Sequence, residues 1–462
     1  MKVILVRPPD ISFGALKNVG GRHHPINSLY LASYLLKDDV EVEIMDLEVE
    51  PDAISSLKDK RPDIIGISTM TPTMLTVVRI ANVGKEIGAK VILGGAHATI
   101  MPEESLRETP ADILIRGEGE ETLREVVRCL DNHSDLKDVE GISYKTDKGI
   151  FHNKPRPYIQ DMDSLPIPDR TLLKLDKYSG ASSVGISKRS TVLFSSRGCP
   201  FNCTFCAAHL TLGRKYRFRS IDSVMEEIES IDRLGFKHIT INDDLFTLRK
   251  ERVMEFCERM HKYPHITFDC DSRVNTIDEE MLRAMKKAGC IKIAYGVESG
   301  SPSVLKHMNK GITIEQVIEA FKKTKEVGII TEAFIIVGYM TETKEDFDMS
   351  MKLLKKIDPH IMVVSMETPY PGTKLYDLYK EKGYLKEDIS WDAFLAFSKK
   401  EIPWRSDHFT GKEILKLRNK MLRRFYLNPL YIAKRIMELK NFADFKYYFK
   451  SGLSVLKVVS RV

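Results

Sequence analysis

Three cysteines, Cys199, Cys203 and Cys206, fall within eight positions of the chain. They directly follow the apolar run 191–194, which predicts a strand, so the thiols lie on the loop after that strand. A loop can turn three thiolates toward one centre. A structural zinc site usually has four closing ligands, whereas three thiolates favour an iron–sulfur cluster with one iron open to another molecule.

Two other interpretations of this loop stay open. His209 offers a fourth ligand for a zinc knuckle, or the three thiols are simply buried. No second Cys-x2-Cys pair occurs in the sequence, which argues against a complete zinc site. The other four cysteines are scattered and are interpreted as ordinary core thiols: Cys129, Cys257, Cys270 and Cys290.

The spacing Cys199-x3-Cys203-x2-Cys206 resembles that of the radical S-adenosylmethionine (SAM) enzymes. The resemblance implies a 4Fe–4S cluster with SAM bound at the open iron and cleaved to methionine and a 5′-deoxyadenosyl radical. It also implies an electron donor such as flavodoxin or ferredoxin. A non-catalytic redox protein with a single cluster is the alternative from another class.

The chain has 462 residues, of which 43% are apolar, which is enough for two or three domains with real cores. No apolar run reaches about 18 residues, and the first apolar run is too short for a signal peptide. Together with the few cysteines, these features predict a cytoplasmic protein in a reducing compartment.

Residues 1–145 alternate strand-like and helix-like runs, which predicts a doubly wound, Rossmann-like α/β domain. Ligands of such sheets bind beyond the carboxyl ends of the strands. Small or glycine residues follow three predicted strands, at Gly20–Gly21, at 68–71 and at 94–97. The predicted strands are 2–6, 40–45, 64–68, 91–95 and 113–116.

The order of these strand ends resembles the cobalamin-binding domain that precedes the radical domain in one branch of radical SAM enzymes. That branch includes hopanoid-modifying enzymes and the anaerobic magnesium-protoporphyrin monomethyl ester cyclase. The Asp-x-His-x-x-Gly signature of other cobalamin domains is absent, so a vestigial domain that acts as a scaffold is the alternative. The resemblance implies cobalamin contacts from Ser68, Thr71, Gly94, Gly95, His97, Gly117 and Glu118.

A polar, proline-rich stretch marks a linker over 146–185, and strands and helices alternate again over 186–385. Such βα units predict a barrel with its active site at the carboxyl ends of the strands. The resemblance implies six strands, as in the partial (β/α)6 barrel of radical SAM enzymes. The apolar runs place them at 191–194, 238–241, 266–270, 292–295, 332–337 and 360–365.

The ends of these strands carry residues suited to SAM. Asp243 and Asp244 match a loop that holds the methionine amino group, and carboxylates bind a protonated amine well. The guanidinium of Arg273 is suited to donate two parallel hydrogen bonds to the SAM carboxylate. Glu298-Ser299 resembles the segment that contacts the ribose and carboxylate of SAM in this family. Pro371-Gly372 resembles the segment that packs against the adenine of SAM. Each residue also has a structural interpretation, such as a helix cap, a buried hydrogen bond or a surface ion pair.

Residues 386–462 predict a helical, basic C-terminal region. The aromatic residues Trp391, Phe394, Phe397 and Trp404 either cover the mouth of the barrel or form a small cap. Residues 411–462 hold thirteen Lys and Arg against three Asp and Glu, a balance of +10 in a chain of net charge +6. Helical spacing over 412–426, 430–440 and 442–459 fits either peripheral contact with an anionic membrane or packing on the protein.

The sequence therefore predicts a cobalamin-dependent radical SAM enzyme, in the simplest case a methyltransferase that acts on an unactivated carbon. The expected substrate is a small-molecule, lipid-like or natural-product-type compound. A cyclase or oxidoreductase of the same architecture is the alternative. Nucleic acid is not expected as a partner, because the extra cysteines and RNA-binding domain of the RNA-modifying methylthiotransferases are absent.

Overall fold

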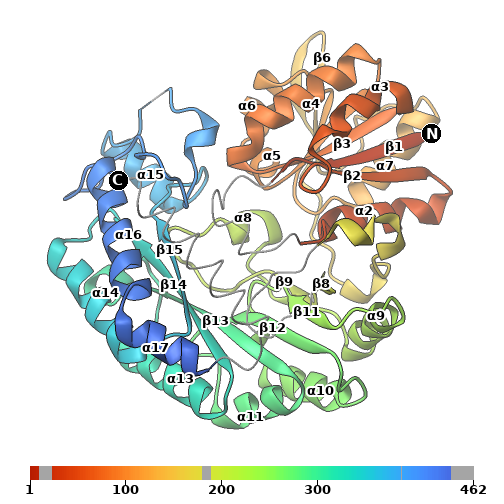
Figure 1. Cartoon of the computed structure of the whole chain (residues 1–462). Coiled ribbons are helices and arrows are strands. Elements are labelled where there is room, and N and C mark those ends of the chain that lie inside the picture. The colour runs from red at the N-terminus through yellow and green to blue at the C-terminus, as the bar shows by residue number, and fades with distance from the viewer. Residues whose placement is uncertain (10–22, 179–188, 387, 439–462) are drawn as a thin grey trace.

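The structure is a computed structural model that describes residues 1–9, 23–178, 189–386 and 388–438. Gly20–Gly21 and the predicted helix 442–459 lie outside these ranges. An N-terminal α/β domain sits above a curved sheet whose helices line its outer side, and the C-terminal helices lie along one edge of that sheet (Figure 1).

The N-terminal domain is built on a seven-stranded sheet in the order β2-β1-β3-β4-β5-β6-β7. The first five of these strands are parallel, as predicted. Val3 and Leu5 pack on one face, whereas Ile4 and Val6 pack on the other. Both faces are therefore covered by helices, as expected for a parallel sheet. The parallel strands are β1 (Lys2–Arg7), β2 (Glu41–Asp46), β3 (Ile64–Thr69), β4 (Lys90–Gly95) and β5 (Ile113–Ile115).

Helices α2 (Ile26–Leu35) and α7 (Glu120–Asp131) cover the first face, and α4 (Met74–Glu86) covers the second. The sheet continues past the predicted boundary at 145. β6 (Ile142–Thr146) pairs antiparallel with β5, and β7 (Gly149–His152) pairs with β6. This polar hairpin was predicted as linker, because its exposed strands lack an apolar run.

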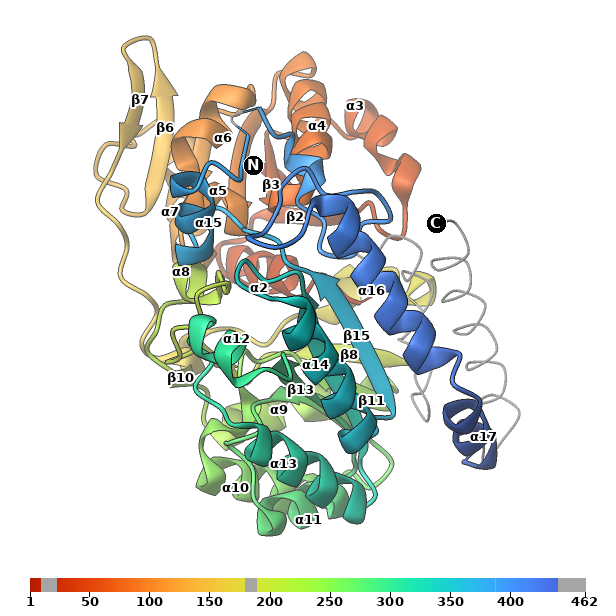
Figure 2. The ribbon, with the colours of Figure 1, turned by 90° about the vertical axis from the view of Figure 1, so that its left-hand side faces the viewer.

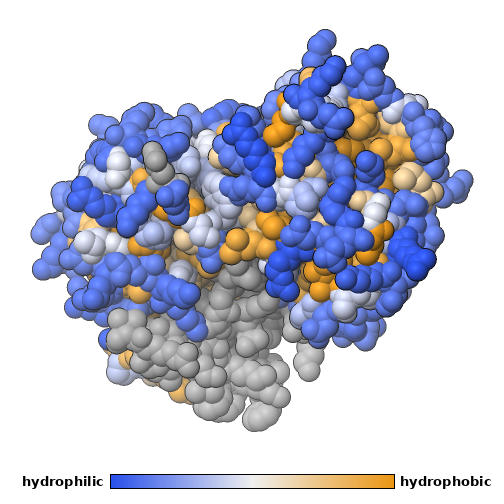
Figure 3. All heavy atoms as spheres, turned by 90° about the horizontal axis from the view of Figure 1, so that it is seen from above, coloured by the Kyte–Doolittle hydropathy of each residue, from blue (hydrophilic) through white to orange (hydrophobic). Residues whose placement is uncertain are grey.

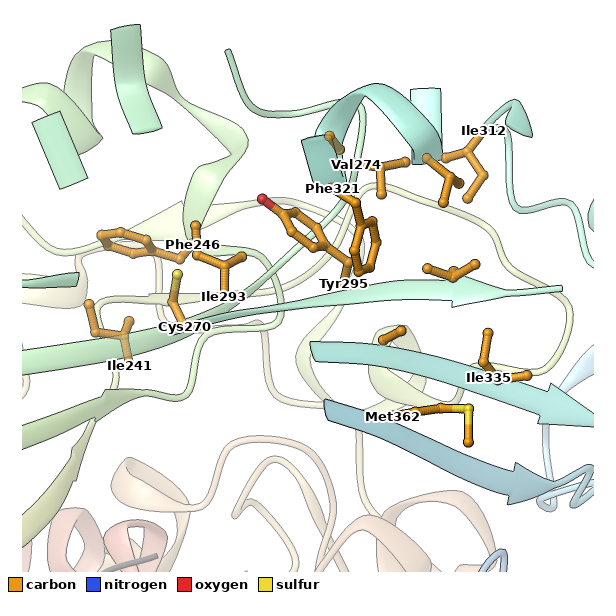
Figure 4. Close-up of a cluster of buried hydrophobic side chains, with 14 of the residues drawn as sticks. Ile241, Phe246, Cys270, Val274, Ile293, Tyr295, Ile312, Phe321, Ile335 and Met362 are labelled. Carbon is orange, nitrogen blue, oxygen red and sulfur yellow. The ribbon is translucent and has the colours of Figure 1, made fainter. Parts of the chain in front are cut away.

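The second sheet has six parallel strands in the order β15-β14-β13-β12-β11-β8, an open barrel with the predicted number of strands. Its outward-facing side chains pack against the surrounding helices in one large core, of which Ile241, Cys270, Ile293, Tyr295 and Phe321 are part (Figure 4). The strands are β8 (Ser190–Leu193), β11 (His238–Ile241), β12 (Thr267–Ser272), β13 (Cys290–Glu298), β14 (Ile330–Val337) and β15 (Ile361–Met366).

The helices of the barrel are α9 (Ile221–Arg233), α10 (Lys250–Met260), α11 (Glu279–Lys287), α12 (Pro302–His307), α13 (Ile314–Glu326), α14 (Lys344–Ile357) and α15 (Lys374–Glu381). Most begin with a side-chain cap; Thr313 and Thr343, for example, each form a capping box.

The C-terminal region consists of an irregular segment, α16 (Gly411–Tyr426) and α17 (Pro429–Met437), which confirms the two predicted helices within the described residues. The two helices descend along the β15 edge of the sheet (Figure 2). Phe394 contacts both Trp391 and Trp404, so the aromatic residues form a cap. Phe397 is partly buried beside it.

Among the described residues, no helix is long and apolar enough to cross a membrane. Seen from above, mainly hydrophilic residues cover the described surface, with hydrophobic patches showing between them on the side of the N-terminal domain (Figure 3). Such scattered apolar surface is ordinary for a folded protein.

Candidate active site

The three-cysteine loop is closed by a small hairpin. Strand β9 (Ser196–Arg197) precedes the loop, α8 (Ala208–Leu212) follows it, and β10 (Arg217–Phe218) pairs antiparallel with β9. Gly198 lies between β9 and Cys199 at φ +89°, where an added Cβ would overlap the carbonyl oxygen of Lys215. Only glycine fits this turn without strain, and the turn directs the loop over the end of β8.

The thiols occupy a sheltered place. Cys203 is buried, and Cys199 and Cys206 are half-buried. Burial raises the pKa of the Cys199 thiol, and it raises the pKa of Cys206 to about 11. Thiols in such surroundings become thiolates when a cationic centre binds them, so the donor set fits an iron–sulfur cluster.

Asp243 holds the corner that leads into this loop. Its two carboxylate oxygens accept hydrogen bonds from the backbone and hydroxyl groups of Ser195 and Ser196, over 2.5–3.0 Å. Asp243 is buried, and all four contacts go to these two serines. The structure therefore gives Asp243 a positioning role, and its predicted contact with the SAM amino group stays a prediction.

Asp244 is placed differently. Its side chain is accessible to solvent, yet desolvation by the surrounding protein raises its pKa. Asp244 accepts one hydrogen bond, from the backbone of Gly198 at 3.1 Å, so it lies beside the start of the cysteine loop. This position fits the predicted contact with SAM.

Arg273 lies directly against the cysteine loop. Its guanidinium stacks on the ring of Phe201 at 3.7 Å from the centroid, and Nη1 is 3.8 Å from Sγ of Cys203. Opposite it, Glu298 ends β13 at φ +63°, after a register shift in the pairing with β14. Its Oε1 accepts a 2.7 Å hydrogen bond from Nζ of Lys310. A buried cation and a buried ion pair thus flank the thiols.

The other predicted SAM contacts separate into two groups. Ser299 is fully buried, and its hydroxyl accepts a hydrogen bond from the backbone of Ser301, so it shapes the turn into α12. Pro371 is buried and Gly372 is exposed, on the turn that follows β15. Gly372 faces the site, whereas Ser299 contributes to it only through the backbone.

The carboxyl edge of the N-terminal sheet has the form of a cradle at β4. An added Cβ at Gly94 would meet no atom within 4 Å, so this residue faces open space. Gly95 lies at φ +100°, and a Cβ there would come within 2.7 Å of the carbonyl oxygen of Thr69. Ser68 is half-buried beside it. Bare backbone at this edge fits the approach of a bulky ligand such as cobalamin.

His97 lies under this edge instead of lining it. It is 1% exposed, its Nδ1 is 3.1 Å from Oγ1 of the buried Thr71, and its ring contacts Trp391 at 4.7 Å. Burial lowers the pKa of His97 to about 4, so the ring is neutral. Its other ring nitrogen, Nε2, is buried without a hydrogen-bond partner, so the predicted cobalamin contacts of His97 and Thr71 stay predictions.

Glu118 joins the two domains, and its predicted contact with cobalamin stays a prediction. Its carboxylate accepts hydrogen bonds from Arg197 and Arg217, each at 2.8 Å, and from the backbone of Ile159. Glu120 accepts a 2.6 Å hydrogen bond from the same Arg197. This set, which we call the interdomain clamp (Glu118, Glu120, Arg197 and Arg217), joins the N-terminal domain to the strand before Cys199. Gly117, the residue before Glu118, lies at φ +77° with open space beside it, so its surroundings leave room for a ligand.

The two candidate cofactor edges meet. Helix α5 (Ala96–Ile100) starts directly after Gly95, and it packs against α8, which starts two residues after Cys206. Gly372 marks the junction, since an added Cβ there would come within 2.6 Å of Ile100 and 3.1 Å of Leu210. The glycine cradle and the thiol loop are therefore each followed by one of two helices that pack together.

A charged group on the inner face of the barrel was missed in the sequence. Asp271 is accessible to solvent between the buried Cys270 and Ser272, and desolvation raises its pKa to about 7. Lys292 bridges the next carboxylates, with Nζ 2.7 Å from Glu332 and 3.6 Å from Asp269. The alternation of acidic and apolar residues along 267–272 was the available signal, because period two marks the two faces of a strand.

Comparison with known proteins agrees with this geometry. The model of the radical SAM superfamily matches residues 193–354, and that of the B12 binding domain matches residues 14–127. An uncharacterized methyltransferase of Pyrococcus horikoshii is 36% identical over 96% of this chain and 96% of its own length. The anaerobic magnesium-protoporphyrin IX monomethyl ester cyclase of Rubrivivax gelatinosus is 30% identical, covering 94% of this chain and 78% of its own.

Among solved structures, the cobalamin-dependent SAM radical enzyme OxsB with bound aqua-cobalamin superposes with a TM-score of 0.76 at 21% identity, covering 99% of this chain and 72% of its own. This likeness shows the fold. The two domain matches show the cofactors, which are a 4Fe–4S cluster, SAM and cobalamin, and they show an enzyme in place of a non-catalytic redox protein. The chain belongs to the radical SAM enzymes that carry a B12-binding domain ahead of the radical SAM domain.

Proposed function

We propose that this enzyme transfers a methyl group to an unactivated carbon of a hydrophobic or natural-product-type substrate. The observation that carries the proposal is the packing of α5, which follows the glycine cradle, on α8, which follows the cysteine loop. The similarity to a methyltransferase along nearly the whole chain supports it. When bound, the cluster and SAM supply a carbon-centred radical and cobalamin supplies a methyl group.

The residues of the chain position these groups and keep water away from them. Cys199, Cys203 and Cys206 are the proposed cluster ligands, with Arg273 stacked beside them. Asp244 is the proposed acceptor for the SAM amino group. Gly94 leaves the backbone bare for cobalamin.

The inner face of the barrel is the proposed place of the substrate. Its β14–β15 side is apolar, where Phe334 pairs in register with Val363. Its β12–β13 side is charged, with Asp271 and Lys292. A surface of this kind suits a compound with an apolar body and a polar group, and a small protein donor such as flavodoxin or ferredoxin is proposed to supply the electron.

The test uses anaerobically purified protein reconstituted with iron, sulfide and cobalamin. SAM with a deuterated methyl group is added with extract from a strain that lacks the gene. We expect 5′-deoxyadenosine, S-adenosylhomocysteine and one product that carries the label. The Cys203→Ala variant is the control and should form none of the three.

The relation to the cyclase gives a second candidate, a cyclisation or oxidation without methyl transfer. In that case 5′-deoxyadenosine forms with a new product that carries no label, and S-adenosylhomocysteine stays at the level of the control. This outcome would refute the methyltransferase.

A further inference from the structure

Helix α17 presents an unusual number of apolar side chains to solvent. Leu430 is 73% exposed and Met437 77%, and both lie on this one helix. Only seven other large apolar residues are exposed in the rest of the described chain. We call the group the α17 apolar face: Leu427, Leu430, Ile432, Ile436 and Met437.

The docking of α17 on the barrel fixes which face is exposed. Tyr431 donates a 2.9 Å hydrogen bond to the carbonyl oxygen of His360, and Arg435, four residues later, is buried. Lys434 pairs with Asp358 at 2.6 Å. Residues four apart lie on the same side of a helix, so Tyr431 and Arg435 face the protein while Leu430 and Met437 point away from it. The apolar face is therefore held outward by specific contacts.

The charge around this face is strongly positive. In the described part of this region, residues 411–438 hold eight Lys and Arg against two Asp and Glu, a balance of +6. Arg423 and Arg424 lie one helical turn before Leu427, and both are exposed. A second copy of the chain would bring the same positive charge against itself, which disfavours self-association through this face. An apolar face bordered by basic residues suits a surface of anionic lipid headgroups.

We propose that the α17 apolar face binds an anionic membrane surface. The apolar side chains enter the boundary between headgroups and acyl chains, and the exposed Arg423 and Arg424 contact the headgroups. The face lies along the β15 edge of the barrel (Figure 2), so the enzyme binds the membrane through that edge. This proposal is independent of the methyl transfer proposed above.

The test is flotation of the full-length holoenzyme with phosphatidylcholine vesicles that contain either no anionic lipid or about 30% phosphatidylglycerol. We expect binding to the anionic vesicles alone, weakened by about tenfold or more in about 0.5 M NaCl. The double substitution Leu430→Glu and Met437→Glu should weaken binding by about tenfold or more. Leu75→Glu with Met349→Glu, at exposed apolar positions elsewhere, is the matched control and should bind as the wild type does.

Several results overturn the proposal. They are absence of binding to anionic vesicles, equal binding to neutral vesicles, and unchanged binding by the α17 double variant. Sedimentation of the free protein gives a further check. A dimer that the α17 double variant abolishes would assign the face to a second copy of the chain instead of a membrane.

Discussion

Removal of Arg197 is expected to open the interdomain clamp. Its guanidinium bonds Glu118 at 2.8 Å and Glu120 at 2.6 Å, and all three side chains are at most 7% exposed. In the Arg197→Met variant Glu118 keeps Arg217, but Glu120 loses the cation that touches it. The perturbation therefore leaves one buried carboxylate without a direct partner.

The cost follows from that unpaired charge. Breaking a buried ion pair by removing one partner destabilises a protein by about 3–5 kcal/mol. For a domain the size of the N-terminal one, this corresponds to a decrease of about 6–20 °C in the midpoint of the first thermal transition. Because Arg197 lies two residues before Cys199, we also expect less iron and sulfide to be retained after reconstitution.

Scanning calorimetry and iron and sulfide analysis of the anaerobic protein measure both effects. The double variant Arg197→Met, Glu120→Gln removes the unpaired charge and should recover at least half of the lost stability. Arg283→Met breaks an equally short ion pair, to Glu279 at 2.6 Å, on the exposed surface of α11. This control should cost less than about 1 kcal/mol.

The reasoning would be refuted by a double variant no more stable than Arg197→Met. It would be refuted equally if Arg197→Met unfolded within about 1 kcal/mol of the Arg283 control, since an exposed pair contributes no more than that.

Three further predictions concern single groups. Burial raises the pKa of Glu342 to about 8, so between about pH 5 and pH 8 the folded state holds a proton that the unfolded state releases. The free energy of unfolding should therefore fall as the pH rises through this range, by up to about 1.4 kcal/mol per pH unit. Urea denaturation of the Glu342→Gln variant should show a weaker dependence on pH. Gly95→Ala should cost about 1–3 kcal/mol, because its Cβ meets Thr69, whereas Gly94→Ala should keep wild-type stability yet bind less cobalamin by absorbance. Asp271→Asn should leave the iron content unchanged and lower product formation by about tenfold or more, and unchanged turnover would remove Asp271 from the substrate surface.

The strands of the N-terminal sheet were predictable because their side chains enter cores on both faces and form apolar runs, whereas each barrel strand has one apolar face that packs in a core. Val91–Leu93 is an example, since its side chains enter two different cores. The hairpin β6–β7 was not predictable in this way. Its strands are half exposed and polar, and they are held by pairing to β5, which no local pattern records.

The site was predictable where the chemistry is local. The spacing of the three cysteines identified the loop, and the paired glycines after β4 identified the cradle. Partners far along the chain left no such signal. Glu118 bonds Arg197, which lies 79 residues away in the chain, and Asp243 bonds Ser195, which lies 48 residues away. The sequence therefore showed polar residues in the right turns, but it did not show which residues bond to them.

The contact of Trp391 with the N-terminal domain has a consequence for the order of assembly. Its indole nitrogen donates a 2.5 Å hydrogen bond to Glu108, a residue 283 positions earlier in the chain. The ribosome must therefore complete most of the polypeptide before this hydrogen bond can form. Until then His97 lacks the Trp391 ring that contacts it in the complete protein.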